Sequence, residues 1–309
     1  MTGPTVSELL TDAATGIRAV PEAQWTARAD AHRERAEAFL APHRRRAAAG
    51  ESHPVWDFLF TYYSLRPRHL TRWHPGYGVV LAGAGARDYL GRTGYTRHTE
   101  GVTVGLDYLR GRQHAVRFIA DLLAATQDRP AVLNCFGLHE WAMVYRSSDI
   151  RHDGVPLRLG VAGTDAVVES MPLRCTHFDA FRFFTDAAAP RNAVALTRDT
   201  QIAHEQPGCV HATMDLYKWC AKLGPLVEAE LLLDCLELAA DARELDMRAS
   251  PYDLTGYGLT PIRIEDATGR AEYVRCQRGL SLRAALLRSM LRDRCDLLLM
   301  ADAADDAGY

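Results

Sequence analysis

The chain has 309 residues, of which 48% are hydrophobic, and its formal net charge is −3 at pH 7. This length and composition predict a globular protein that buries a sizeable core. The slightly acidic balance excludes strong nonspecific binding to duplex nucleic acid through charge alone.

Two features of the sequence bear on location. The seven cysteines are widely spaced and none forms a CxxC pair, which favours reduced thiols over a disulfide framework. No apolar run approaches the roughly twenty residues that cross a bilayer, and the first residues lack the basic start and apolar run of a signal peptide. We therefore expect a cytoplasmic protein with no membrane partner.

The apolar pattern predicts a mainly α fold, a single helical domain over residues 21–300, with a flexible tail over 1–20 and an acidic tail over 301–309. A small central β element is expected from short apolar runs separated by Gly and Asp. Helices are predicted over 24–49, 114–126, 131–145, from 210 onward, 228–248 and 270–299. Strands are predicted at 158–163, 166–169 and 261–265.

The segment 201–219, QIAHEQPGCVHATMDLYKW, gathers more reactive side chains than any other. Pro207 and Gly208 predict a turn that leads into a helix. His211 and Asp215 are four residues apart, so they share one face of that helix. The pattern predicts an imidazole and a carboxylate aimed into one space, either a reactive pocket or a buried hydrogen-bonded pair.

Other polar segments are expected to converge on the same place. THFD at 176–179 carries His177 and Asp179, and 244–253 ends a helix in a polar turn. LHEW at 138–141, with His139 and Glu140, is a further candidate segment whose convergence is not predicted. We predict four catalytic residues: Asp215, His211, Asp179 and His177. His204 precedes the turn and is expected to be a bystander.

A metal site is an alternative use of these groups. Imidazole and carboxylate ligands suit iron, manganese or zinc. The expected ligands are His177, Asp179, His211 and Asp215, with His139 or Glu140 as additions. The HExxH spacing is absent, so the sequence does not require a cofactor, and a divalent transition metal stays an open alternative.

Aromatic and basic residues suggest a substrate surface. Chemistry on a nucleobase needs aromatic walls for stacking, and arginines suit phosphate contacts. Such aromatic side chains more often fill the core. Arg66, Arg68 and Arg72 alternate with aromatic residues, whereas Arg44 to Arg46 are expected on a solvated helix face. The substrate-binding candidates are Tyr63, Trp73, Tyr217, Trp219, Arg66, Arg72 and Arg248.

Several stretches together resemble a family of actinobacteria and other bacteria whose members carry the name 3-methyladenine DNA glycosylase. They are FLFTYYSLRP, RWHPGYGV, THFDAFRFF, EQPGCVHATMDLYKW, ELDMRASPYDL and EYVRCQR. The likeness runs from about Trp25 to the final helix, and it implies excision of alkylated purines, a DNA-repair activity. It supplies no assigned catalytic residues for this chain.

The residues and the resemblance together predict an N-glycosylase, a hydrolase that acts on DNA or a related nucleoside. Asp215 or Asp179 would stabilise the sugar cation or orient water, as carboxylates do in glycoside cleavage; Asp246 and Asp253 are further carboxylates that could serve. Two alternatives stay open: a metal-dependent enzyme acting on a small molecule, and a non-catalytic protein with buried polar networks. No protein partner is inferred.

Overall fold

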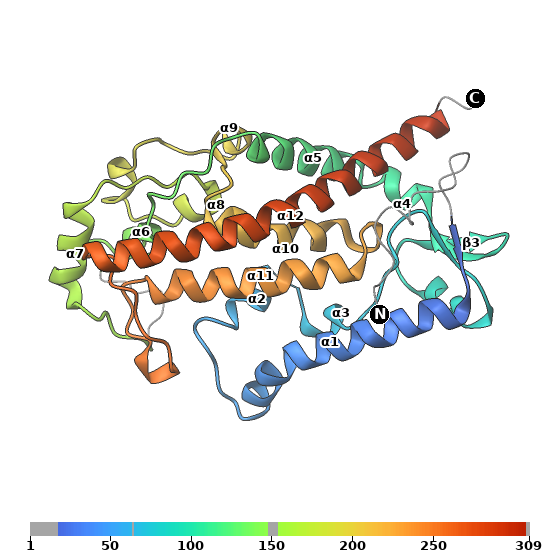
Figure 1. Ribbon diagram of the computed structural model, residues 1–309, viewed down its shortest axis with the longest axis horizontal. Coiled ribbons are helices and arrows are strands. Elements are labelled where there is room, and N and C mark those ends of the chain that lie inside the picture. Colours follow the sequence, from blue (N-terminus) through green and yellow to red (C-terminus); the bar gives the residue numbers. More distant parts are fainter. Residues whose placement is uncertain (1–17, 64, 148–153, 307–309) are drawn as a thin grey trace.

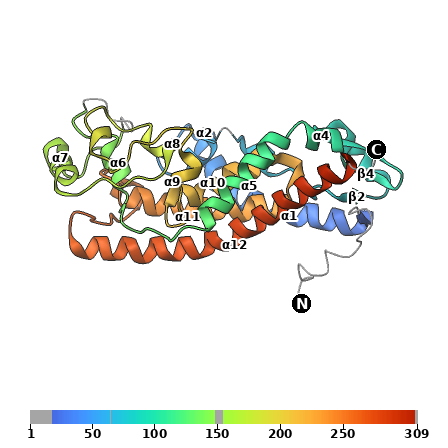
Figure 2. The same ribbon diagram turned by 90° about the horizontal axis from the view of Figure 1, so that it is seen from above.

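The computed structural model describes residues 18–63, 65–147 and 154–306 (Figure 1). The fold is mainly helical and elongated, and the long helices follow the long axis of the molecule (Figures 1 and 2). A small sheet lies at one end. The prediction of a mainly α single domain is confirmed. The longest helices are α1 (Glu22–Ala48), α5 (Gln113–Gln127), α10 (Val210–Leu223), α11 (Ala229–Arg248) and α12 (Ala267–Asp306).

Helices α5, α10, α11 and α12 form the central bundle, in which α10 packs against both α11 and α12. α10 and α11 are buried on almost every side, because their apolar residues surround the helix axis. α12 instead buries one row of residues spaced three or four apart, the pattern of an amphipathic helix. That row is Leu280, Ala284, Leu287, Leu291, Cys295 and Leu298.

Shorter helices and turns connect the long ones. Their bounds are α2 (Phe58–Thr61), α3 (Pro67–Leu70), α4 (Leu106–Arg110), α6 (Leu138–Ala142), α7 (Gly160–Ser170), α8 (Phe178–Phe181) and α9 (Gln201–His204). The 3₁₀ turns are η2 (Ala84–Gly91), η3 (Ala189–Arg191), η4 (Gly224–Leu226) and η5 (Thr255–Tyr257).

The sheet has the strand order β1-β2-β4-β3, with β1 parallel to β2 and the other pairs antiparallel. Its strands are β1 (Arg18–Val20), β2 (Val79–Leu81), β3 (Tyr95–His98) and β4 (Gly101–Val104). Trp25, Trp73 and Tyr89 pack beside it in a cluster separate from the main core. Helix α1 then reaches back to α11, where Arg35 binds Asp234 and Glu237.

The predicted helices at 24–49, 114–126, 228–248, 270–299 and from 210 onward are confirmed, but the β element lies elsewhere. Residues 160–170 form helix α7 instead of the predicted strands, and 261–265 is not a strand. The sheet is built from residues 18–104. Short apolar runs do not distinguish a buried helix from a strand, which accounts for the error.

The predicted helix over 131–145 is also wrong in its first half. Phe136 and Gly137 have positive φ angles of 52° and 74°, so the chain cannot run helically through them. Only Leu138–Ala142 is helical. The loop that results carries His139 into the core at the start of α6, where it is 2% exposed.

The predicted tails are shorter than expected where they can be followed. Arg18–Val20, assigned to the tail, pairs with β2, and α12 continues through Asp306 rather than ending before 301. The rest of both predicted tails, residues 1–17 and 307–309, lies outside the described residues. Within the described part of the chain, no helix combines the length and apolar character needed to cross a bilayer.

Candidate functional site

Three histidines meet in the core where α6, α10 and the turn before α8 come together. The His211 ring lies against both others: it is edge-on to His139, with centroids 4.4 Å apart, and stacked on His177 at 5.3 Å. All three are less than a tenth exposed. An imidazole stack of this kind is costly to bury unless its nitrogens find partners, so the surrounding carboxylates decide its chemistry.

We call His139, His211 and Asp246 the first triad. One ligand atom from each lies within 4.8 Å of the others. His139 Nε2 approaches Asp246 Oδ1 at 2.8 Å, but neither atom has a hydrogen bond of acceptable geometry. Nδ1 of His211 is also buried without a hydrogen-bond partner. His139 and Asp246 thus form an ion pair, and His211 adds a ring nitrogen with no hydrogen-bond partner beside it.

We call His177, Glu205 and Asp215 the second triad, which meets the same 4.8 Å limit. His177 Nε2 lies 3.2 Å from Asp215 Oδ2 and 3.4 Å from Glu205 Oε1. Gln201 donates its amide to Glu205 Oε1 at 2.5 Å. The atoms of this triad are therefore already engaged in hydrogen bonds.

A lysine neutralises the second triad. Lys218 Nζ lies 2.7 Å from Asp215 Oδ2 and 2.6 Å from Asp179 Oδ2. Tyr63 donates its hydroxyl to the other oxygen of Asp215 at 3.3 Å. Burial by itself would raise the pKa of Asp215, but Lys218 and His177 outweigh burial, so the pKa lies below its ordinary value and the carboxylate stays ionised.

In the first triad the nearest guanidinium lies 3.5 Å from the carboxylate of Asp246, farther than Lys218 lies from Asp215 in the second. Arg243 Nη1 contacts Glu140 at 2.9 Å and Asp246 at 3.5 Å, so one guanidinium serves two buried carboxylates. Burial raises the pKa of Asp246, although His139 and Arg243 lower it. Burial also lowers the pKa of His211, reinforced by His139, which keeps His211 neutral. A neutral imidazole is the form that binds a metal ion. Burial by itself would lower the pKa of the other imidazole, His139, but Asp246 outweighs burial and raises it, so an ion bound there would displace a proton from that ring.

A small cavity adjoins the first triad. Its volume is about 10 Å³, room for roughly one water molecule or ion. Besides Nδ1 of His211, the hydroxyl of Tyr273 and Oε1 of Gln277 lack hydrogen-bond partners. The lining residues are Cys135, His139, Cys175, Thr176, Gln206, Cys209, Val210, His211, Tyr273 and Gln277.

The structure brings together three of the four predicted catalytic residues, His177, His211 and Asp215, but not as one ligand set. His211 groups with His139 and Asp246, whereas Asp179 joins neither triad. It binds Lys218, Arg198 at 3.0 Å and Arg182 at 3.3 Å. The metal set expected from the sequence is therefore split between two triads.

Of the predicted substrate residues, the two tyrosines lie near the site. The rings of Tyr63 and Tyr217 meet edge-on at 5.3 Å, and Tyr217 is fully buried. Tyr63 also reaches Asp215, as described above. These two aromatic residues therefore pack around the second triad rather than standing open as walls for a base.

Of the other predicted substrate residues, Trp219 touches the site only through Lys218, whose Nζ lies 4.4 Å from the centre of its ring, and the rest make their contacts elsewhere. Trp73 is buried beside the sheet and donates to Glu230, and Trp219 packs against Phe118. Arg248 Nε donates to the carbonyl of Thr260. The three predicted arginines in and beside α3 are exposed, namely Arg66, Arg68 and Arg72.

Sequence reasoning missed several members of the site. Glu205 carried no recognisable signal, because His204 and Glu205 are not followed by the second histidine of an HExxH zinc motif. Lys218 stands three residues after Asp215, so the i, i+3 spacing on α10 could have revealed that pair. Arg243 carried no such signal, since its partner Glu140 is 103 residues away.

Comparison with known proteins adds no assignment. No protein-family model matches the chain, and neither the curated proteins nor the solved structures give a match.

Proposed function

We propose that the protein is a metal-dependent enzyme that acts on a small molecule, with one divalent transition-metal ion held by the first triad. The observation that carries this proposal is the grouping of His139, His211 and Asp246 within 4.8 Å beside a cavity of ionic size. Two imidazoles and one carboxylate with open positions form a ligand set suited to iron, manganese or zinc.

A bound ion of this kind supplies a Lewis acid and lowers the pKa of a coordinated water. The chain contributes the rest. The neighbouring Glu140–Arg243 pair holds Asp246 from the far side, and Cys135 Sγ lies 3.5 Å from His139 Nδ1, which favours coordination through Nε2. His177, stacked on His211 and bonded to Asp215, can hold a proton next to the site.

The second triad is a poorer place for a cation. Lys218 already supplies a positive charge to Asp215, and an added ion would meet the ammonium group at close range. We therefore assign one ion to the first triad and a proton-holding role to the second.

The N-glycosylase activity implied by the resemblance is a second candidate. In its favour, Asp215 stays ionised beside Tyr63, as a residue that stabilises a sugar cation must. However, Asp215 is only 1% exposed, so a purine nucleoside would reach it only after the surrounding helices opened. The first triad is equally buried, so a small-molecule substrate would also need an opening to reach it, but the adjoining cavity has room for an ion in the closed structure.

Elemental analysis of untagged protein tests the metal proposal. We expect about one transition-metal ion per chain, lost in His211→Ala and Asp246→Asn and retained in His204→Ala, which changes a half-exposed histidine nearby. Circular dichroism checks that each variant is folded. A folded, metal-free wild type that also fails to bind added Co²⁺ would refute the proposal.

The glycosylase candidate has a separate test, release of 3-methyladenine from methylated DNA. Asp215→Asn and Asp179→Asn, singly and together, should abolish release if these carboxylates act on the sugar. Release that is unchanged in all three variants contradicts that assignment.

A further inference from the structure

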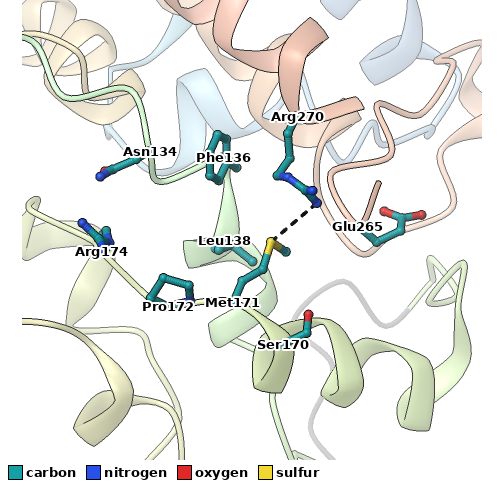
Figure 3. A pocket seen from close by; sticks show the side chains of 9 residues that line it. All are labelled: Asn134, Phe136, Leu138, Ser170, Met171, Pro172, Arg174, Glu265 and Arg270. Carbon is teal, nitrogen blue, oxygen red and sulfur yellow. Dashed lines mark hydrogen bonds between the residues drawn. The ribbon is translucent and has the colours of Figure 1, made fainter. Parts of the chain in front are cut away.

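A cleft of about 560 Å³ opens beside the buried site (Figure 3). Asn134, Phe136 and Leu138 form one wall and come from the chain that leads into α6. Arg174 follows α7 on a second wall, and Arg270 comes from the first turn of α12. This volume lies within the usual range for sites that bind small molecules.

A single layer of chain separates this cleft from the first triad. Alternate residues face opposite ways: Phe136 and Leu138 line the cleft, whereas Cys135 and His139 line the small cavity beside the triad. In the same way, Arg174 lines the cleft and Cys175 lines the small cavity. The consecutive positive φ angles of Phe136 and Gly137 shape this wall. A ligand in the cleft therefore lies on the opposite side of this wall from the metal site, and it contacts the ion only if the wall moves.

The cleft has a positive charge surplus. Glu265, the acidic residue that lines it, is held by Arg158 through two contacts of 2.6 Å, so its charge is balanced. Arg174 is exposed. Arg270 donates from Nη1 to the carbonyl of Ile264, a neutral partner, and its guanidinium lines the cleft. Two arginines and no unbalanced carboxylate among the lining residues favour an anion.

We infer that this cleft binds the substrate of the proposed enzyme, a small organic anion with a carboxylate or phosphate group and an apolar body. The anionic group faces Arg174 and Arg270, and the body packs on Phe136, Leu138 and Met171. This inference rests on the proposed function for the ligand's role as substrate, but the binding can be measured independently of it.

Isothermal titration calorimetry with phenyl phosphate, benzoate and neutral benzyl alcohol tests the inference on the full-length protein. At least one anion should bind, and benzyl alcohol should bind more weakly by about tenfold or more. Arg174→Gln and Arg270→Gln should each weaken anion binding by about tenfold. Arg263→Gln, which removes an exposed arginine outside the cleft, should leave it unchanged.

The outcomes separate the two proposals. Absence of anion binding, or equal binding by Arg174→Gln, Arg270→Gln and wild type, overturns the cleft assignment even if the protein contains its metal. If the protein contains no metal but still binds anions through these arginines, the proposed function is overturned and the assignment of the cleft as an anion site stands. The comparison of benzoate with phenyl phosphate identifies the anionic group.

A different observation concerns the outer face of α12, which runs along one side of the molecule (Figure 2). Of the ten large apolar side chains that are exposed in the described residues, five lie on this helix. At 100° per residue they fall within about 80° of its circumference, a single stripe. They are Leu282, Leu286, Met290, Leu297 and Met300, and the most exposed, Leu282, is 71% accessible.

The charge of α12 is divided along its length. Residues 267–286 carry four arginines and one glutamate, whereas 287–306 carry five aspartates and three arginines. Arg275 and Asp293 are exposed and 18 residues apart, five full turns, so both lie on the stripe. In an antiparallel pair centred at residue 284, Arg275 meets Asp293 of the second copy, and Leu282 meets Leu286.

We propose that the stripe is the dimer interface of two antiparallel copies of α12. Analytical ultracentrifugation should show a dimer that Leu286→Glu dissociates, while Val161→Glu, a matched change at an exposed residue of α7, leaves it intact. Arg275→Asp and Asp293→Arg should each weaken the dimer, and the double variant should restore it. A monomeric wild type, or charge reversals that fail to rescue one another, would overturn the antiparallel dimer.

Discussion

Lys218 and Asp215, three residues apart on α10, form an ion pair of 2.7 Å inside the protein, and the same ammonium group binds Asp179. One buried cation thus serves two carboxylates that come from different parts of the chain. Its removal would leave both carboxylates without their main source of compensation, which makes Lys218 the most informative residue for stability.

Lys218→Met should lower the free energy of unfolding by about 3 kcal/mol, because it leaves uncompensated charge in the core. Lys222→Met removes an exposed lysine from the same helix and should change stability by no more than about 0.5 kcal/mol. Urea unfolding measures both. Adding Asp179→Asn to Lys218→Met should recover part of the loss, and a Lys218→Met protein as stable as wild type would contradict the pairing.

The stability of the protein should depend on pH through His74, which contacts the Tyr95 hydroxyl at 2.9 Å. Burial lowers the pKa of His74 to about 3, with a further contribution from Arg92. In the unfolded chain the pKa is about 6.5. As pH falls from about 6.5 toward 3, His74 is protonated in the unfolded state but not in the folded state. The free energy of unfolding therefore decreases by up to about 1.4 kcal/mol per pH unit.

The slope assigned to His74 can be isolated by substitution. Denaturation of His74→Gln at several pH values should show a shallower loss of stability across this window than wild type. His114→Gln, which removes an exposed imidazole, should reproduce the wild-type slope. Identical slopes for His74→Gln and wild type would show that His74 is protonated without penalty.

Gly137 should tolerate alanine poorly. Its φ of 74° disfavours any Cβ, and an added methyl would lie 3.3 Å from the Ala249 side chain. Gly50 has nearly the same φ, 73°, with open space around it, so Gly50→Ala reports the backbone cost alone, about 1 kcal/mol. We expect Gly137→Ala to lose more stability than Gly50→Ala in thermal or urea unfolding. Equal losses would mean that the chain around Gly137 moves to accommodate the methyl group at no cost.

The contact between α1 and α11 should weaken in salt. Arg35 binds Glu237 and Asp234 through three hydrogen bonds, at 2.7 to 2.8 Å, but its side chain is 39% exposed. Arg35→Met should therefore cost only about 1 kcal/mol at low ionic strength, and less in 1 M NaCl, where screening acts over about 3 Å. Arg45→Met, an exposed change in the same helix, serves as the control, and a loss that does not depend on salt would point to packing instead.

The sequence predicted the long helices well because each carries a sustained apolar pattern that tertiary contacts reinforce. It failed between residues 131 and 170, where the path depends on two consecutive positive φ angles and on short apolar runs that suit either helix or strand. Pro207 and Gly208 were correctly expected to precede a helix, and the amide of Gln277 holds the carbonyl of Gly208 at 2.7 Å.

The site was predicted less completely than the fold. His211 and Asp215 share a face of α10 as their spacing indicates, but the spacing does not determine which partner each one meets. His211 turns to His139 and Asp246, whereas Asp215 turns to His177 and Lys218. Partner choice depends on how α6, α10 and α11 pack, information that no local pattern contains.

The two triads and the charged residues around them also affect folding kinetics. Its contacts join residues far apart in the chain: Tyr63 meets Asp215 across 152 positions, and Glu140 meets Arg243 across 103. Such pairings have high contact order and form only after long loops have closed. A partly assembled core would leave carboxylates in apolar surroundings without their cations. We therefore expect these polar contacts to form together and late in folding.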